Sequence, residues 1–369
     1  NWTAYQFLGA PISSIPQSAL AYAPTYLSYL IATRLLGSEN YSMEVFSILH
    51  VAAGFLALYG TARYAGIRPS VAAAGSLTVA LSGFTLIAGR SWLPVLPVAL
   101  WMSALAALAI RMERGPLSHA WILLTGLTLA GAIYTGYPQT WIYALMIFVL
   151  AVVLLVWSGR VPIRRGIAAI PAVIFGFGLA SPLLVPQAME SLRAIGNRES
   201  FPGLGGIGGG LLSTLLPYPL AVSEHPYRWG STFYEYMGQF YNSGTLFTLL
   251  ALLLLAAASA VRFDRKLIGS NLWLMCAGVA FLFALGEQGI LWPAMEKLPV
   301  FDKLTGPFKF MPYMLLCTAL GVGLALERIL RLSRRPVLWE AGIVTVLGAL
   351  LLYHASLPMP AFYSYGDKP

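Results

Sequence analysis

The chain has 369 residues, of which 58% are hydrophobic and only 10% are charged, and its mean hydropathy is +0.73. A water-soluble domain carries about a quarter charged residues because its surface faces water, so this composition excludes an ordinary soluble protein. The net charge of +9 does not indicate nucleic acid, because no basic stripe alternates with aromatic residues and arginines clustered near anionic headgroups account for it.

Long apolar runs predict an all-α, polytopic transmembrane helix bundle. Runs of this kind match the hydrocarbon core of a bilayer, which is roughly 30 Å thick and takes about 20 helical residues to cross. They are continuous rather than alternating, which favours helices over a barrel. About ten spans are predicted, at residues 42–64, 69–89, 92–111, 119–135, 139–158, 167–187, 243–261, 270–288, 310–328 and 337–354.

These spans predict two transmembrane bundles and three outer segments. The first residue is Asn1 rather than methionine, so we expect a fragment that begins in a loop outside the membrane. Aromatic residues before the first span predict interfacial helices, with Trp2, Tyr5, Tyr22, Tyr26 and Tyr29 as anchors. The segments are an outer amphipathic segment (1–41), a first bundle (42–187), an outer loop (188–242), a second bundle (243–354) and an outer tail (355–369).

Basic residues predict the orientation of the bundle. Short cytoplasmic loops retain lysine and arginine, and alternate connections of this chain hold 14 of its 23 basic residues. The sequence therefore predicts that these loops are cytoplasmic and that both termini lie outside. The 14 residues are Arg63, Arg68, Arg111, Arg114, Arg160, Arg164, Arg165, Arg262, Arg265, Lys266, Arg328, Arg331, Arg334 and Arg335.

Ionisable residues within apolar runs are the next candidates, because burying them in a membrane is costly. His50 lies in the middle of a predicted span and is interpreted as a hydrogen-bonded core histidine, with a pigment or haem ligand as the alternative. Arg90 lies between two spans, where it either extends to the headgroups or binds a phosphate. Cys276 and Cys317 are expected to be inert core residues. The sequence has neither Ser/His/Asp spacing nor a metal-ligand cluster, so no metal or cofactor is predicted.

Five short segments carry a resemblance that covers nearly the whole chain. They are residues 1–11 with 16–18 (Asn-Trp-Thr-Ala-Tyr-Gln-Phe-Leu-Gly-Ala-Pro and Pro-Gln-Ser), 136–140 (Gly-Tyr-Pro-Gln-Thr), 186–190 continuing to 197–198, 236–238 (Tyr-Met-Gly), and 298–301 continuing to 307–310 (Pro-Phe-Lys-Phe). In this order they resemble motifs of the YfhO-type bacterial membrane proteins, which are relatives of the GT-C glycosyltransferases. Tyr137 stands where that family has histidine, and Thr305 where it often has arginine.

The resemblance implies a GT-C-like enzyme of the bacterial cytoplasmic membrane. Such an enzyme moves a sugar from a polyprenyl-phosphate donor to a cell-envelope acceptor on the outer face, and the family's acidic catalytic residue is expected upstream of this chain. Cations at the outer face would hold the donor phosphate, and aromatic and amide side chains would line the sugar site. The candidates are Arg90, Arg198 and Lys309 for the phosphate, and Trp92, Tyr137 and Gln139 for the sugar.

Two other functions stay open at this point. One is a non-catalytic accessory or scaffold subunit of a larger membrane complex, for which other membrane subunits would be partners besides membrane lipids. The other is a lipid or solute transporter or flippase. Transporters bring broken helices and polar groups to the middle of the bilayer, whereas the predicted spans place only His50 and scattered Ser, Thr and Gly at that depth.

Overall fold

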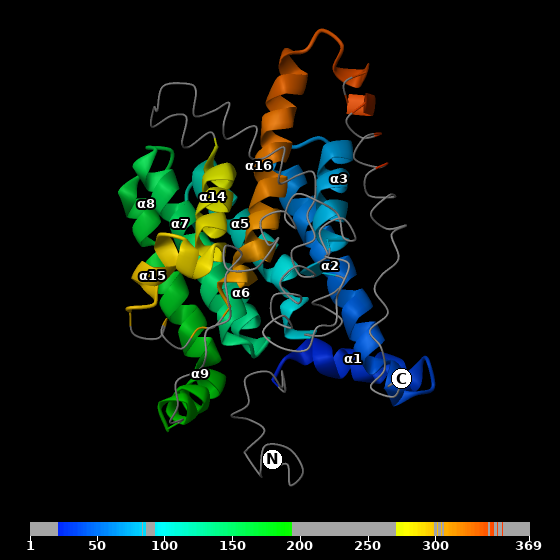
Figure 1. Cartoon of the computed structure of the whole chain (residues 1–369), viewed down its shortest axis with the longest axis vertical. Coiled ribbons are helices and arrows are strands. Elements are labelled where there is room, and N and C mark those ends of the chain that lie inside the picture. Colours follow the sequence, from blue (N-terminus) through cyan, green and yellow to red (C-terminus); the bar gives the residue numbers. More distant parts are fainter. Residues whose placement is uncertain are drawn as a thin grey trace.

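The computed structural model describes residues 21–82, 84–85, 93–193, 271–298, 301, 304, 306–338, 340–342, 345 and 349. Across these ranges every regular element is a helix, which confirms the predicted all-α class (Figure 1). The α-helices are α1 (Ala23–Arg34), α2 (Ser42–Ala65), α3 (Pro69–Ala80), α5 (Val98–Arg114), α6 (His119–Tyr134), α7 (Pro138–Trp157), α8 (Ile163–Ile167), α9 (Ala169–Arg193), α14 (Leu272–Ala284), α15 (Leu291–Met295) and α16 (Met311–Leu332). Short 3₁₀ turns are η4 (Glu39–Tyr41), η6 (Leu93–Val95), η7 (Gly286–Gln288) and η9 (Pro307–Phe310).

Four helical stretches in the described ranges are long and apolar enough to cross a bilayer: Glu39–Ala65, Pro138–Trp157, Ile163–Met189 and Pro307–Arg331. Three shorter helices are also apolar: Pro69–Ala80, His119–Tyr134 and Leu272–Ala284. Helix α5, with 17 residues, coincides with most of the predicted span at 92–111. The predicted span at 243–261 and most of the one at 337–354 lie outside the described residues.

Helix α3 is shorter than the sequence predicted. A helix was expected over 69–89, but α3 ends at Ala80. At the break, the Thr85 hydroxyl donates to the Val79 carbonyl over 2.8 Å, and the Thr85 N–H donates to the Ser82 hydroxyl over 3.2 Å. These hydroxyls satisfy backbone groups that an interrupted helix leaves open, which allows a break among apolar neighbours.

The core is centred on α16, while α9 is peripheral. In the apolar stretch Pro307–Arg331, which contains most of α16, 78% of an 18-residue segment is buried. In the stretch Ile163–Met189, which contains most of α9, the corresponding share is 17%. Helix α16 packs on α14, α3 and α5, whereas α9 packs chiefly on α6. The backbones of α6 and α9 approach closely where Gly126 meets Gly176, because a Cβ on Gly176 would lie 3.0 Å from the Gly126 carbonyl oxygen. Small residues at such crossings are typical of helices that pack within a membrane.

Helix α9 contains Pro182 and Pro186 in its interior. A proline lacks the N–H that would bond to the carbonyl four residues earlier, so Pro182 deprives the Gly178 carbonyl of its usual donor. The Ser181 hydroxyl donates to that Gly178 carbonyl over 2.8 Å. A neighbouring side chain thus replaces the missing backbone hydrogen bond.

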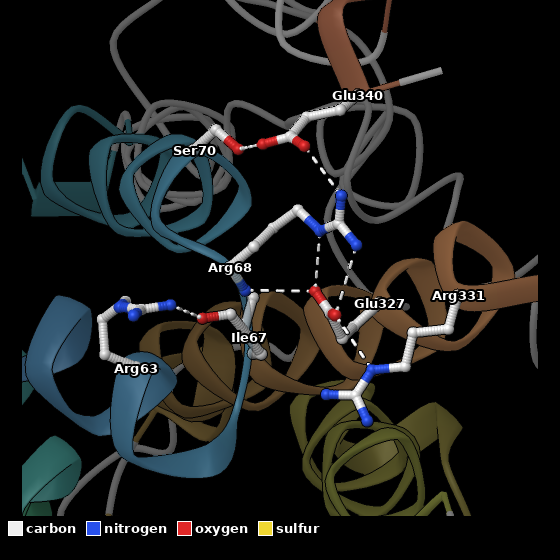
Figure 2. A network of polar contacts seen from close by, with 7 residues as sticks. All are labelled: Arg63, Ile67, Arg68, Ser70, Glu327, Arg331 and Glu340. Atoms are coloured by element: carbon white, nitrogen blue, oxygen red, sulfur yellow. Dashed lines mark hydrogen bonds and ion pairs between the residues drawn. The ribbon is translucent and has the colours of Figure 1, made fainter. Parts of the chain in front are cut away.

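The connections rich in arginine meet at one end of the bundle. Arg68, between α2 and α3, donates through Nε to Glu327 over 2.9 Å and through Nη1 to Glu340 over 2.7 Å (Figure 2). Glu327 also accepts from Arg331 over 3.0 Å, and Ser70 donates to Glu340. The two glutamates raise the pKa of Arg68 above its usual value, chiefly through their hydrogen bonds to the guanidinium. This Arg68 network ties the α2–α3 connection to the last turns of α16.

A second pair of contacts adds further basic connections to this end. Arg160 forms an ion pair with Glu113 over 3.0 Å, and Arg165 donates to the Met112 carbonyl over 3.0 Å. Four of the basic residues predicted to share one face, Arg68, Arg160, Arg165 and Arg331, thus form contacts between the connections at this end. Figure 1 shows these connections at the upper end of the helices and α1 across the lower end.

Candidate ligand-binding site

Two glycine turns, far apart in the sequence, position the residues of the site at the end opposite the Arg68 network. Gly136 has φ of 85° and joins α6 to α7, so that Tyr137 becomes the N-cap of α7. Gly306 has φ of 80° and precedes η9, which carries Lys309. A side chain at either glycine would be strained, because this left-handed conformation favours glycine. The turns thus place Tyr137 and Lys309 where α7 and α16 begin.

Lys309 joins the two segments through hydrogen bonds. Its ammonium group donates to the Tyr137 hydroxyl and to Gln139 Oε1, each over 2.6 Å. The Tyr137 hydroxyl donates to the same Gln139 oxygen, and Lys309 Nζ lies 5.2 Å from the centre of the Tyr137 ring. Lys309 is only 5% exposed. An extended lysine that reaches the headgroups keeps its ammonium in water, so this lysine does not snorkel.

Aromatic stacking holds the surrounding side chains in place. The Phe310 ring lies between Tyr143 and Phe283, with centroid distances of 3.9 Å and 4.8 Å and nearly parallel planes. Tyr313, one helical turn after Lys309, donates its hydroxyl to the Thr140 carbonyl. Stacked and bonded rings of this kind restrict side-chain rotation, so the site is pre-organised rather than mobile.

The side chains enclose a small cavity between α7 and α16. Its lining includes Tyr137, Gln139, Tyr143, Lys309 and Tyr313. The cavity volume of about 10 Å³ is about what one water molecule needs. Tyr143 is fully buried, and its ring rather than its hydroxyl faces the cavity, because the cavity surface is apolar.

The electrostatics of the Lys309 cluster favour an anionic or strongly electronegative ligand atom. Lys309 supplies a positive charge, and the first turn of α7 adds the positive end of a helix dipole. Both effects are stronger in a site shielded from water than at the surface. The described lining residues include no aspartate or glutamate, so none of them is assigned as a catalytic base.

The structure brings together three of the six residues predicted for the site. Tyr137, Gln139 and Lys309 form one hydrogen-bonded cluster, whereas Arg90, Trp92 and Arg198 lie outside the described residues. The sequence analysis assigned Lys309 to the phosphate, and Tyr137 and Gln139 to the sugar. Because Lys309 contacts both of these residues directly, the three form one cluster rather than two separate subsites.

Sequence reasoning missed Tyr143 and Tyr313. Each lies four residues after a predicted site residue, Gln139 and Lys309 respectively, and therefore on the same face of its helix. That spacing was the signal available in the sequence.

A second buried polar cluster involves His50. Its Nε2 lies 2.9 Å from the Tyr22 hydroxyl, and its Nδ1 lies 2.8 Å from the Phe46 carbonyl oxygen. Trp101 donates to the Tyr22 oxygen over 3.2 Å, so the Tyr22 proton is directed to His50. All these groups are satisfied, which confirms the interpretation of His50 as a hydrogen-bonded core histidine.

The same cluster corrects the prediction for Tyr22. Tyr22 was expected to be an interfacial anchor, but it is 2% exposed, and burial raises its pKa to about 12. Tyr26 and Tyr29 on α1 are exposed, and their role as interfacial anchors stays a prediction. Cys276 and Cys317 are both buried, as expected for core residues.

Comparison with known proteins gives no family for this chain. No protein-family model matches it, and no curated protein matches it either.

Proposed function

We propose that the chain is a GT-C-like membrane glycosyltransferase that uses a polyprenyl-phosphate sugar donor, and that Lys309 binds the donor phosphate. One observation carries the proposal: Tyr137, Gln139 and Lys309, taken from two of the resembling motifs, meet in a buried cluster although about 170 residues separate them. An ammonium beside a helix N-terminus suits a phosphate. In this proposal the chain has about ten spans, lies in a bacterial cytoplasmic membrane and has both termini outside.

Binding of a prenyl monophosphate to the detergent-solubilised chain tests the role of Lys309. Charge-assisted hydrogen bonds contribute about 1.5–3 kcal/mol, so Lys309→Ala is expected to weaken binding about tenfold to a hundredfold. The matched control is Lys297→Ala, which removes an exposed lysine near the same end. Equal affinities in both variants and in the wild type would reject the site.

The size of the cavity favours a second candidate function, a non-catalytic subunit of a membrane complex. A space for about one water molecule does not accommodate a sugar ring. Sugar transfer from a labelled polyprenyl-phosphate donor separates the two functions. Binding of prenyl monophosphate without transfer would favour the subunit over the enzyme.

The proposed orientation has its own test. Cysteine introduced at Asn40, predicted outside, is expected to react with an impermeant maleimide in intact cells. Cysteine at Arg334, on the end with the Arg68 network, is expected to react only after permeabilisation. Both positions are exposed, and the native Cys276 and Cys317 are buried and should stay silent. The reverse pattern would invert the topology.

A further inference from the structure

Tyr22 holds the start of α1 against the bundle. It is the N-cap of α1, and it is the largest buried side chain of this segment, since the others are Ser28 and Ala32. Its hydroxyl meets His50 of α2 over 2.9 Å and Trp101 of α5 over 3.2 Å. The docking of α1 on α2 and α5 therefore depends on the state of these rings.

The hydrogen bonds of His50 require a neutral ring. The Phe46 carbonyl oxygen can only accept, so the His50 Nδ1 atom 2.8 Å away carries a proton. Nε2 is then without a proton and accepts from the Tyr22 hydroxyl. The Tyr22 oxygen in turn accepts from Trp101. Each donor in this cluster thus has one acceptor while the imidazole carries a single proton.

A second proton, on Nε2, would disrupt the contact between His50 and Tyr22. The Tyr22 oxygen would have to accept from His50 as well as from Trp101, and the Tyr22 proton would lose its acceptor. The positive charge would also be buried, because His50 is only 2% exposed. Burying a charge without a partner is costly, so the docked position of α1 disfavours a protonated His50.

No acidic side chain is placed to compensate a charge on His50 in the part of the chain that the structure describes. Two ionisable groups pack in its aromatic cluster, Tyr22 and Tyr134, and Tyr134 donates to the Leu179 carbonyl. The charged residues of α2 and of the elements packed on it are either exposed or at the end with the Arg68 network. They are Arg34, Glu39, Glu44, Arg63, Arg111, Glu113, Arg114, Glu327, Arg328 and Arg331.

We propose that His50 and Tyr22 form an acid-sensitive latch, which holds α1 on the bundle while His50 is neutral and releases α1 when His50 takes up a proton. The released state binds more protons than the docked state. Docking is therefore fully present above about pH 6.5, where a free imidazole titrates, and weakens as the pH falls below that value. The latch does not depend on the ligand proposed for Lys309. In the proposed orientation, α1 lies outside and the latch responds to the external medium.

Cysteine labelling of the detergent-solubilised chain measures the release of α1. Ser28→Cys places a thiol on the buried face of α1, and Leu30→Cys places one on its exposed face as the reference. The ratio of their rates with a maleimide cancels the pH dependence of the reaction itself. We expect this ratio to rise about tenfold or more from pH 8 to pH 5, with about thirtyfold as the limit for one proton.

Two histidine variants show which group takes up the proton. His50→Gln keeps an oxygen that can accept from Tyr22 but does not titrate, so its labelling ratio should be the same at pH 8 and pH 5. The matched control combines His119→Gln, His225→Gln and His354→Gln, which leaves His50 as the single histidine and should keep the rise. Nitrogen NMR of this control should show the His50 proton on Nδ1 at pH 8, and a positively charged ring where the rise occurs.

Three results would overturn the inference. A ratio that stays within about twofold between pH 8 and pH 5 would show that α1 does not respond to acid. A rise that persists in His50→Gln, or that disappears in the single-histidine chain, would assign the proton to another group. If α1 is already released at pH 8 in His50→Gln, the NMR readout decides: a ring that becomes charged with the rise supports the latch, and a ring that stays neutral rejects it.

Discussion

Lys309 and Arg68 lie at opposite ends of α16, and the protein stabilises their positive charges in different ways. Lys309, beside the first turn, donates to two neutral oxygen atoms, those of Tyr137 and Gln139. Arg68 meets Glu327 and Glu340 near and beyond the last turns, and its side chain is 21% exposed. Sixteen residues of helix separate Met311 from Glu327, or roughly 24 Å.

The difference indicates two roles for a buried or half-buried cation. A guanidinium held by two carboxylates is neutralised, and its fork geometry joins segments of backbone, which is a structural task. The hydrogen bonds described for Lys309 come from neutral dipoles, and an ammonium held in this way retains its attraction for an anion. Substitutions at the two ends should therefore separate stability from binding.

The largest effect is expected from Glu327→Leu. Glu327 accepts from the Arg68 backbone N–H and guanidinium and from Arg331. Its loss leaves Arg68 with Glu340 alone, and the Arg68 N–H and Arg331 lose their acceptor, so we expect a loss of about 3 kcal/mol of unfolding free energy, measured by denaturation in detergent micelles. The double variant Arg68→Met/Glu327→Leu is expected to recover much of that loss, because removing both partners can be nearly neutral. Equal losses in the single and double variants would contradict this account.

The next largest effect is expected in the neutral polar cluster of Tyr22, His50 and Trp101. Tyr22→Phe removes the partner of both His50 Nε2 and Trp101 Nε1. Two buried ring nitrogens left without partners should cost about 2 kcal/mol of stability, visible as a lower melting temperature. The control Tyr29→Phe, on an exposed side chain of the same helix, should change stability by about 0.5 kcal/mol or less. A loss as large in Tyr29→Phe would show that α1 is sensitive to any such change.

Lys309→Met should have a small effect on stability despite the burial of this residue. The hydrogen bond between Tyr137 and Gln139 remains, and the desolvated charge is removed, so the free energy of unfolding should change by about 1 kcal/mol or less. Arg68→Met, the equivalent change at the other end, should cost about 2 kcal/mol, because Glu340 loses its ion pair and Glu327 keeps only the one with Arg331. Thermal unfolding of the two variants in parallel measures the contrast, and comparable losses would remove the distinction between the ends.

The smallest effect belongs to Arg331→Gln. This side chain is 68% exposed, and its ion pair with Glu327 spans one helical turn. Pairs of this kind contribute about 0.3–0.5 kcal/mol, and Glu327 keeps its bonds to Arg68. Denaturation in detergent at low and high salt should show a small difference that salt removes. A loss above about 1.5 kcal/mol would show that Arg331 belongs to the inner part of the network.

Part of the site could be predicted from the sequence, because short motifs contain its residues. Tyr137 and Gln139 come from one motif and Lys309 from another, but no local pattern shows that these segments touch. Their contact depends on how α7 and α16 pack, which is a tertiary property. The full burial of Tyr143 beside this cluster could not be predicted either, because it depends on the stacking of Phe310 on its ring.

The fold shows the same limit. Apolar runs identified the helices α2 and α7 to within one residue and α16 to within four, since hydropathy reports burial in lipid or protein. The break in α3 was missed because Ser82 and Thr85 barely lower the hydropathy of their run, although their hydroxyls end the helix. Tyr22 was misplaced because an aromatic residue before a span suits an interface and a core equally well.

The pairing of Ser181 with Pro182 has a consequence for how this protein can change over generations. The Ser181 hydroxyl donates to the Gly178 carbonyl, which Pro182 leaves without a backbone donor. Substitutions at positions 181 and 182 should therefore be coupled. Alanine at 181 would leave the Gly178 carbonyl without a donor unless residue 182 were also changed to one with a backbone N–H. Threonine at 181 would keep the hydroxyl and the hydrogen bond. Descendants of this chain should therefore exchange serine with threonine freely, but lose the hydroxyl only together with the proline.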